Sequence, residues 1–116
     1  MLQKRKLVIF RNYYHEFYKS QNENVREKVN YVLFLITIAD RLPSKFFKHI
    51  KGAYGLYEIR VEFESNFYRI FCCFDEGNLV ILFNGFTKKS RMTPKKEITK
   101  ALKIKDEYFR EKINYG

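Results

Sequence analysis

The sequence predicts an α+β domain in which two N-terminal helices pack on an antiparallel sheet of about four strands, with a C-terminal helix after the sheet. Two observations predict this class. Apolar residues recur with the period of a helix before residue 40 and after residue 94, whereas between residues 56 and 86 they alternate with polar residues or run continuously, as in strands. The chain has 116 residues, 46% of them apolar, which is enough for one core. Residues 1–116 are therefore expected to form a single domain.

The N-terminal third is expected to contain a short strand and two helices. The apolar run Leu7–Phe10 suits a strand, and Asn12 is placed to cap a helix that reaches Lys19. Asn24 is expected to cap a longer helix, which Pro43 ends at the latest. The apolar residues of this helix follow helical spacing and are Val25, Val29, Val32, Leu33 and Ile36.

The middle of the chain predicts three antiparallel strands in a meander. Leu42–Gly55 contains a proline and two glycines and is expected to be a loop. Apolar and polar residues then alternate through Leu56–Phe63, and short polar turns separate the next two strands, Phe67–Phe74 and Leu79–Phe86. The third strand is apolar on both faces, which suits the centre of a sheet that helices cover.

The last quarter of the chain predicts a helix with Thr93 as its cap and Pro94 in its first turn. One side of this helix is mostly lysine. The apolar residues lie roughly on the other side and are Ile98, Ala101, Leu102, Tyr108, Phe109 and Ile113.

Positive charge is concentrated at the start of this helix. The net charge of +10 favours nucleic acid, an anionic membrane surface or an acidic protein as partner. Between Lys88 and Lys105, eight basic residues face a single acid, Glu97, whereas Leu56–Thr87 carries more acids than bases. We expect this segment to bind a polyanion, with RNA the leading candidate. The alternative is a solvated helix face that only keeps the protein soluble.

Several classes of protein are disfavoured. The longest apolar run, Tyr31–Ala39, is about half of the roughly 20 residues that a membrane span needs, so a cytoplasmic protein with no membrane partner is expected. Cys72 and Cys73 are neighbours in an expected strand, point to opposite faces and are expected to stay reduced. His15 is expected to pack among aromatic residues, and His49 is a weak candidate for proton transfer. With only these isolated histidines, neither a metal nor another cofactor is expected.

The candidate catalytic site is a group of charged residues at one face of the sheet. Glu58 and Arg60 share a face of the first meander strand, Arg69 lies on the strand that pairs with it, and Lys88 and Lys89 end the third strand. Arginine forks and lysine charges can bind a phosphate. Cleavage of RNA without metal requires such cations, a base for the 2′-hydroxyl and an acid for the leaving 5′ oxygen. The alternative is an ordinary exposed ion pair between Glu58 and Arg60.

Four segments of the chain form an ordered set of motifs. They are Gly52-Ala-Tyr-Gly-Leu-Tyr-Glu-Ile-Arg-Val, Asn66-Phe-Tyr-Arg-Ile-Phe, Leu82-Phe-Asn-Gly-Phe-Thr-Lys-Lys-Ser-Arg-Met-Thr-Pro and Glu97-Ile-Thr-Lys-Ala. In this combination the chain resembles the RelE/HigB superfamily of bacterial toxins, and most closely its phage-derived HigB-like branch. The resemblance extends from about Gly52 to Phe109.

The resemblance implies a RelE-like fold and a toxin that cuts mRNA, typically on the translating ribosome, and that a cognate helix-turn-helix antitoxin (HigA-like) holds inactive. By position, Arg60 and Arg69 match the family's phosphate-contacting residues, and Lys88 and Lys89 match its basic pair after the last strand. Glu58 falls where some members have a basic residue and others an acidic one, so its role as general base is a hypothesis.

The same resemblance leaves the general acid open. Several members have a Tyr or His near the end of the sheet or in the next segment, where this chain has Phe86 and Thr93. Phe86 can stack on a base of the RNA but cannot move a proton. Further RNA contacts are expected from Arg91, Lys95, Lys96 and Lys100.

Three functions are consistent with the sequence. The first is a metal-independent mRNA endonuclease that acts on ribosomes. The second is a toxin of the same fold that binds a protein such as gyrase, as ParE-type members do without nuclease residues. The third is a non-catalytic module that binds RNA or the ribosome. The joint presence of Arg60, Arg69 and the two lysines favours the nuclease.

Overall fold

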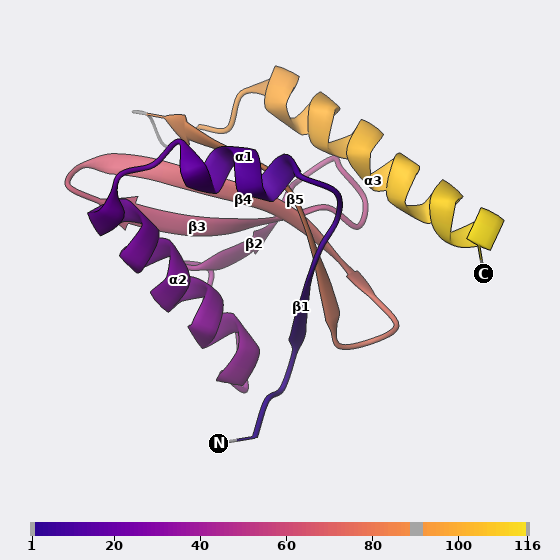
Figure 1. The fold of residues 1–116 in the computed structure, drawn as a ribbon, viewed down its shortest axis with the longest axis horizontal. Helices are drawn as coiled ribbons and strands as arrows, with labels where there is room; N and C mark the ends of the chain where they lie inside the picture. Colours follow the sequence, from indigo (N-terminus) through magenta and orange to yellow (C-terminus); the bar gives the residue numbers. More distant parts are fainter. Residues whose placement is uncertain (1, 89–91, 116) are drawn as a thin grey trace.

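The computed structural model describes residues 2–88 and 92–115 and confirms the α+β class (Figure 1). The elements run in the order β1 (Lys6–Ile9), α1 (Tyr13–Lys19), α2 (Glu23–Ile38), β2 (Phe47–His49), β3 (Tyr57–Phe63), β4 (Asn66–Asp75), β5 (Leu79–Lys88) and α3 (Lys95–Tyr115). Two of the expected site residues, Lys89 and Arg91, lie outside the described residues.

The sheet is mixed and has five strands in the order β1-β5-β4-β3-β2. The meander of β3, β4 and β5 is antiparallel as predicted. The expected sheet of about four antiparallel strands differs on two points: β1 runs parallel to β5, and β2 lies inside the expected loop. The two intervening helices and the meander make the parallel pairing possible, because parallel strands need a long connection. β2 has three residues, too few for an alternating pattern to reveal it.

The helices cover the two faces of the sheet unequally (Figure 1). Helices α1 and α2 pack over one face, and α3 packs against β4 and β5 on the other. Cys72 belongs to the core on the first face and Cys73 to the core on the second, and both are buried free thiols as predicted. Since β4 is the middle strand of the sheet, most of its side chains are buried.

Helix α1 approaches β5 closely because a glycine lies beneath it. A Cβ added to Gly85 would stand 2.6 Å from the ring of Phe17. The side chain of any other residue would therefore push α1 away from the sheet. Phe17 is buried in the core that α1 shares with α2.

One predicted helix cap is in place and another is shifted. Asn12 lies at the N-cap of α1, which ends at Lys19 as predicted, although the Asn12 side chain makes no capping hydrogen bond. Asn22, rather than Asn24, caps α2, and its Oδ1 accepts a hydrogen bond from the amide of Val25 at 3.0 Å. Helix α3 begins at Lys95, two residues after Thr93, and the Thr93 hydroxyl binds side chains of the sheet. Within the described part of the chain, no helix is long and apolar enough to cross a membrane.

Candidate active site

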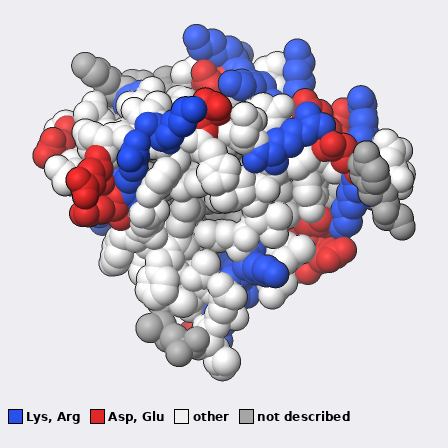
Figure 2. Space-filling model, viewed as in Figure 1, with Lys and Arg blue, Asp and Glu red and all other residues white. Residues whose placement is uncertain are grey.

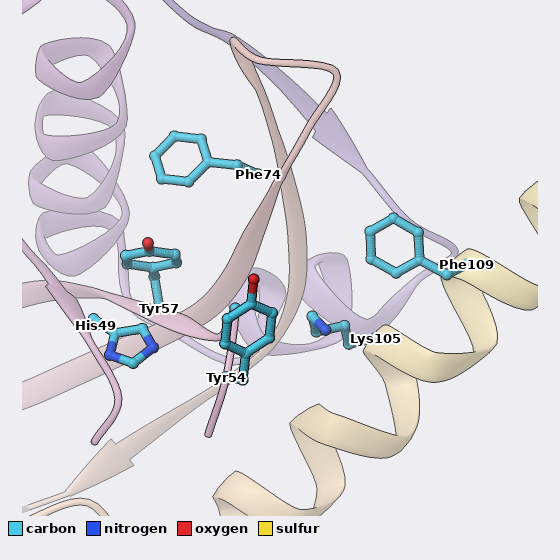
Figure 3. A pocket seen from close by; sticks show the side chains of 7 residues that line it. His49, Tyr54, Tyr57, Phe74, Lys105 and Phe109 are labelled. Atoms are coloured by element: carbon cyan, nitrogen blue, oxygen red, sulfur yellow. The ribbon is translucent and has the colours of Figure 1, made fainter. Parts of the chain in front are cut away.

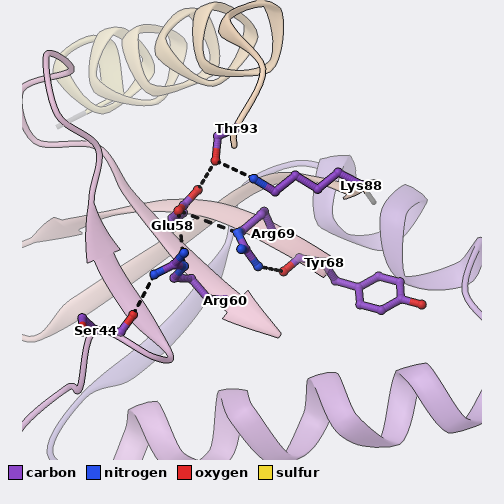
Figure 4. A network of polar contacts seen from close by, with 7 residues as sticks. All are labelled: Ser44, Glu58, Arg60, Tyr68, Arg69, Lys88 and Thr93. Carbon is purple, nitrogen blue, oxygen red and sulfur yellow. Dashed lines mark hydrogen bonds and ion pairs between the residues drawn. The ribbon is translucent and has the colours of Figure 1, made fainter. Parts of the chain in front are cut away.

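Four of the predicted site residues meet beside the start of α3, on the same face of the sheet. The strand register sets Arg60 opposite Arg69, and Arg69 opposite Phe86. Glu58 lies two residues before Arg60 and therefore points to the same face. Lys88 approaches from the end of β5 (Figure 4).

Glu58 is the centre of this cluster. Its side chain is buried, and its Oε1 lies 3.5 Å from Nε of Arg60 and 3.7 Å from Nε of Arg69. The two Nε–H groups are themselves buried and make no hydrogen bond within the described residues. The side chains of Arg60 and Glu58 are 23% and 6% exposed, so their pair is not the ordinary exposed one that was the alternative. Both Nε–H groups face Glu58 at ion-pair distance, and neither forms a full hydrogen bond to it.

The arginines are held in place by the backbone around them. Arg69 is 1% exposed, and its guanidinium donates to the carbonyl of Tyr68 at 3.2 Å and lies over the ring of Phe67. Burial lowers the pKa of Arg69, against the opposing effect of Glu58, but an arginine stays protonated in proteins. Arg60 donates to the carbonyl of Ser44 at 3.1 Å. The segment before β2 thus fixes one arginine and β4 fixes the other.

Lys88 and Thr93 complete the cluster. Lys88 is 8% exposed, and its Nζ donates to Oγ1 of Thr93 at 3.2 Å, while the Thr93 hydroxyl donates to Oε2 of Glu58 at 2.8 Å. Burial, together with the charge of Arg69, lowers the pKa of Lys88 to about 8. A lysine with that pKa can both hold and release a proton near neutral pH. Lys88 is thereby a candidate for the general acid that the sequence left open.

The chemical character of the cluster is that of an anion site. Three cationic side chains surround one carboxylate, so the cluster carries a net positive charge. An entering phosphate is therefore attracted. Among the described residues, no group of three side chains could hold a metal ion.

The other predicted residues lie outside the cluster. Phe86 is half-buried and stacks on Phe71 with ring centroids 5.6 Å apart, so one face of its ring is already covered. His15 is exposed on α1, and its ring lies 5.9 Å from that of Tyr14, one of the aromatic residues expected around it. His49 is exposed on β2 away from the cluster. Lys95, Lys96 and Lys100 are exposed on α3. In Figure 2, basic side chains line the edge of the molecule where α3 lies.

Sequence reasoning missed the role of Thr93. Thr93 is 35 residues away from Glu58, and its position before Pro94 resembles that of an ordinary helix cap. Its place within the basic segment Lys88–Lys105 and within one of the motifs was the only signal. The burial of Lys88 was also not predicted, because lysines at strand ends are usually exposed.

Comparison with known proteins identifies the family of this chain. Residues 16–106 match the model of a family described as Phage derived protein Gp49-like. The chain belongs to the Gp49-like family. This is a family of RelE/HigB-type toxins, so the Gp49-like chain is a toxin of a toxin–antitoxin system. No curated protein matches its sequence.

A solved structure supports the fold of this Gp49-like protein. It is the archaeal RelE-RelB complex from Pyrococcus horikoshii OT3, with a TM-score of 0.55 and 11% identity. The alignment covers 77% of this chain and 99% of the other. At that identity the likeness shows a RelE-like fold, as the motifs of the sequence had implied.

Proposed function

We propose that this Gp49-like toxin is a metal-independent endoribonuclease that cuts mRNA on translating ribosomes in the cytoplasm. The observation that carries the proposal is the buried cluster in which Arg60, Arg69 and Lys88 surround Glu58. Each function that RNA cleavage needs has a residue in this cluster. The two arginines bind the phosphate, and the carboxylate of Glu58 is the general base. The general acid is Lys88, whose pKa is lowered to about 8.

The proposed reaction is an attack by the RNA on its own backbone. Glu58 takes the proton of the 2′-hydroxyl, and the 2′ oxygen forms a bond to phosphorus. The two arginines stabilise the added negative charge. The bond from phosphorus to the 5′ oxygen then breaks, and Lys88 gives a proton to that oxygen. The products are a 2′,3′-cyclic phosphate and a free 5′-hydroxyl.

The contact between Lys88 and Glu58 through Thr93 fits this cycle. After cleavage Glu58 carries a proton and Lys88 has given one up. The Thr93 hydroxyl lies between the two groups, 2.8 Å from Oε2 of Glu58 and 3.2 Å from Nζ of Lys88. A proton can therefore return from the acid form of Glu58 to the neutral amine of Lys88 through this hydroxyl.

The direct test adds the purified toxin to ribosomes that are translating a defined mRNA. Primer extension should reveal new 5′ ends, and the upstream fragments should carry a 2′,3′-cyclic phosphate. Arg69→Ala should abolish these ends, whereas Lys6→Ala, at an exposed position of β1, should leave them unchanged. Ends that carry a 5′-phosphate would contradict the proposed chemistry. Toxicity without cleavage would instead favour a toxin that binds a protein such as gyrase, and RNA binding without either would favour a non-catalytic module.

We also propose that a cognate antitoxin, with a helix-turn-helix domain of the HigA-like kind, holds the toxin inactive. The RelE chain of the archaeal structure is in complex with RelB. The net charge of +10 favours a partner with an acidic segment. Co-expression of the toxin with the product of the adjacent reading frame should yield a stable complex that no longer cuts mRNA. Full cleavage by the complex would contradict this partner.

A further inference from the structure

A second cleft lies away from the catalytic cluster, between the sheet and α3 (Figure 3). Its volume of about 500 Å³ is in the range of sites that bind small ligands. In Figure 3, rings from the sheet form one wall and α3 forms the other. The lining residues are His49, Tyr54, Gly55, Tyr57, Phe74, Lys105 and Phe109.

The sheet wall of this aromatic cleft is rigid. Tyr57 is stacked on Phe47 with centroids 5.2 Å apart, and it meets both His49 and Phe74 edge to face at 5.1 Å. Three ring contacts therefore fix the orientation of Tyr57. Tyr54, in contrast, is 93% exposed at the mouth of the cleft and is free to stack on a ligand.

The α3 wall supplies a positive charge. Lys105 packs over Gly55, and its Nζ lies 5.4 Å from the centre of the Phe109 ring. Lys105 has no ion pair within residues 2–88 and 92–115, and the lining contains no carboxylate. Two exposed lysines, Lys48 and Lys51, flank His49 in the chain. The cleft thus combines flat aromatic surfaces with uncompensated positive charge.

These properties select one class of ligand. Aromatic side chains stack on nucleic-acid bases whatever the sequence, and a neighbouring cation can bind a phosphate. A nucleotide has both groups, whereas a purely apolar ligand would cover the charge of Lys105 without supplying a counter-charge. The position of the cleft also fits a strand of RNA. Lys105 lies ten residues into α3, or about 15 Å along the helix from its start beside the catalytic cluster, and the exposed Lys100 and Lys103 lie between them.

We propose that the aromatic cleft, beside the middle of α3, is a nucleotide subsite. It binds one base and phosphate of the single-stranded RNA that is cleaved at the cluster beside the start of α3. The inference deepens the proposed function and names a site that neither the motifs nor the family comparison assigns. In this arrangement, stacking in the cleft fixes the strand, and the cluster around Glu58 acts on a phosphate several nucleotides away.

The test measures binding separately from cleavage. The probe is a short single-stranded 2′-O-methyl oligonucleotide that contains 2-aminopurine, because its blocked 2′ oxygen prevents cleavage and its fluorescence falls when the base stacks. The wild-type protein should quench the probe. Tyr54→Ala should bind about tenfold more weakly and no longer quench the probe, since one base stack is removed. When Lys105→Gln binds the probe, about one counterion fewer should be released from the oligonucleotide, which is measured from the salt dependence of binding.

Two matched variants serve as controls. Tyr31→Ala removes a tyrosine that is 53% exposed on α2, and Lys6→Gln removes an exposed lysine from β1, at the opposite edge of the sheet from β2. Both variants should bind and quench the probe as the wild type does. If Tyr54→Ala and Lys105→Gln behave as their controls do, the subsite is wrong. The proposed subsite is also wrong if an acidic peptide binds in the cleft and the oligonucleotide does not.

The result also distinguishes this inference from the proposed nuclease. Cleavage that depends on Arg69, together with unchanged probe binding by Tyr54→Ala, would overturn the subsite alone. Quenching that depends on Tyr54, in a protein that never cuts mRNA, would support the subsite and overturn only the nuclease.

Discussion

The buried cluster around Glu58 and the exposed lysines of α3 are both rich in positive charge but differ in their surroundings. In the cluster, Arg69 is 1% exposed and Lys88 is 8% exposed, whereas Lys95, Lys96 and Lys100 are exposed to solvent. A charge in a low-dielectric environment interacts strongly and keeps a fixed position, while an exposed charge is screened by salt. We therefore propose that the buried cations perform the chemistry and the exposed cations provide attraction. Net charge alone does not distinguish these roles.

The largest effect should come from Arg69. Arg69→Ala removes a buried donor to the phosphate and leaves Glu58 with one arginine fewer, so cleavage should fall by about 100-fold or more. Arg69→Lys keeps the charge but not the planar fork and should recover only part of the activity. Primer extension on translated mRNA measures both. Thermal unfolding of each variant should accompany the assay, because a folded Arg69→Lys protein with wild-type activity would exclude a role for the fork.

The next effect concerns Lys88 and pH. The pKa of Lys88 is lowered to about 8, so its acid form disappears as the pH rises through that value, well before an ordinary lysine would give up its proton. Cleavage of one bound mRNA should therefore decline above about pH 8. Lys88→Gln should lower the rate about 100-fold and remove the decline, since no acid remains to titrate. A wild-type rate that stays level up to pH 10 would show that Lys88 is not the acid.

Thr93 should have a smaller effect, because it positions other groups. Thr93→Val keeps the shape of the side chain but removes the hydroxyl that joins Lys88 to Glu58, and the rate should fall by about tenfold. Thr93→Ser keeps the hydroxyl and should restore activity. The pH at which the rate declines should also move in Thr93→Val but not in Thr93→Ser. A helix cap without a role in the site would leave that pH unchanged.

Sequence reasoning identified the parts of this comparison that depend on local pattern. Alternation along β3 was enough to place Glu58 and Arg60 on one face, and the short turn after β3 was enough to bring Arg69 opposite them. The burial of Lys88 and the contact from Thr93 depend on how α3 begins above the sheet, which is a long-range arrangement that no local pattern encodes. The three-residue β2 was missed for a related reason. It is defined by its pairing with β3, and only that pairing brings the carbonyl of Ser44 to Arg60.

The smallest effect on rate, and the sharpest test of the comparison, should come from the exposed face of α3. Replacing Lys95, Lys96 and Lys100 together with glutamine removes charge from solvent-exposed positions without touching the cluster. RNA binding should weaken at low salt, and the slope of log affinity against log salt should fall by about 0.7 for each RNA phosphate that a lysine no longer neutralises. The rate of cleavage at saturating substrate should stay unchanged, because no group that touches the reacting phosphate is altered. A fall in that rate at saturation would mean that this face takes part in the chemistry, and the division between buried and exposed cations would then be wrong.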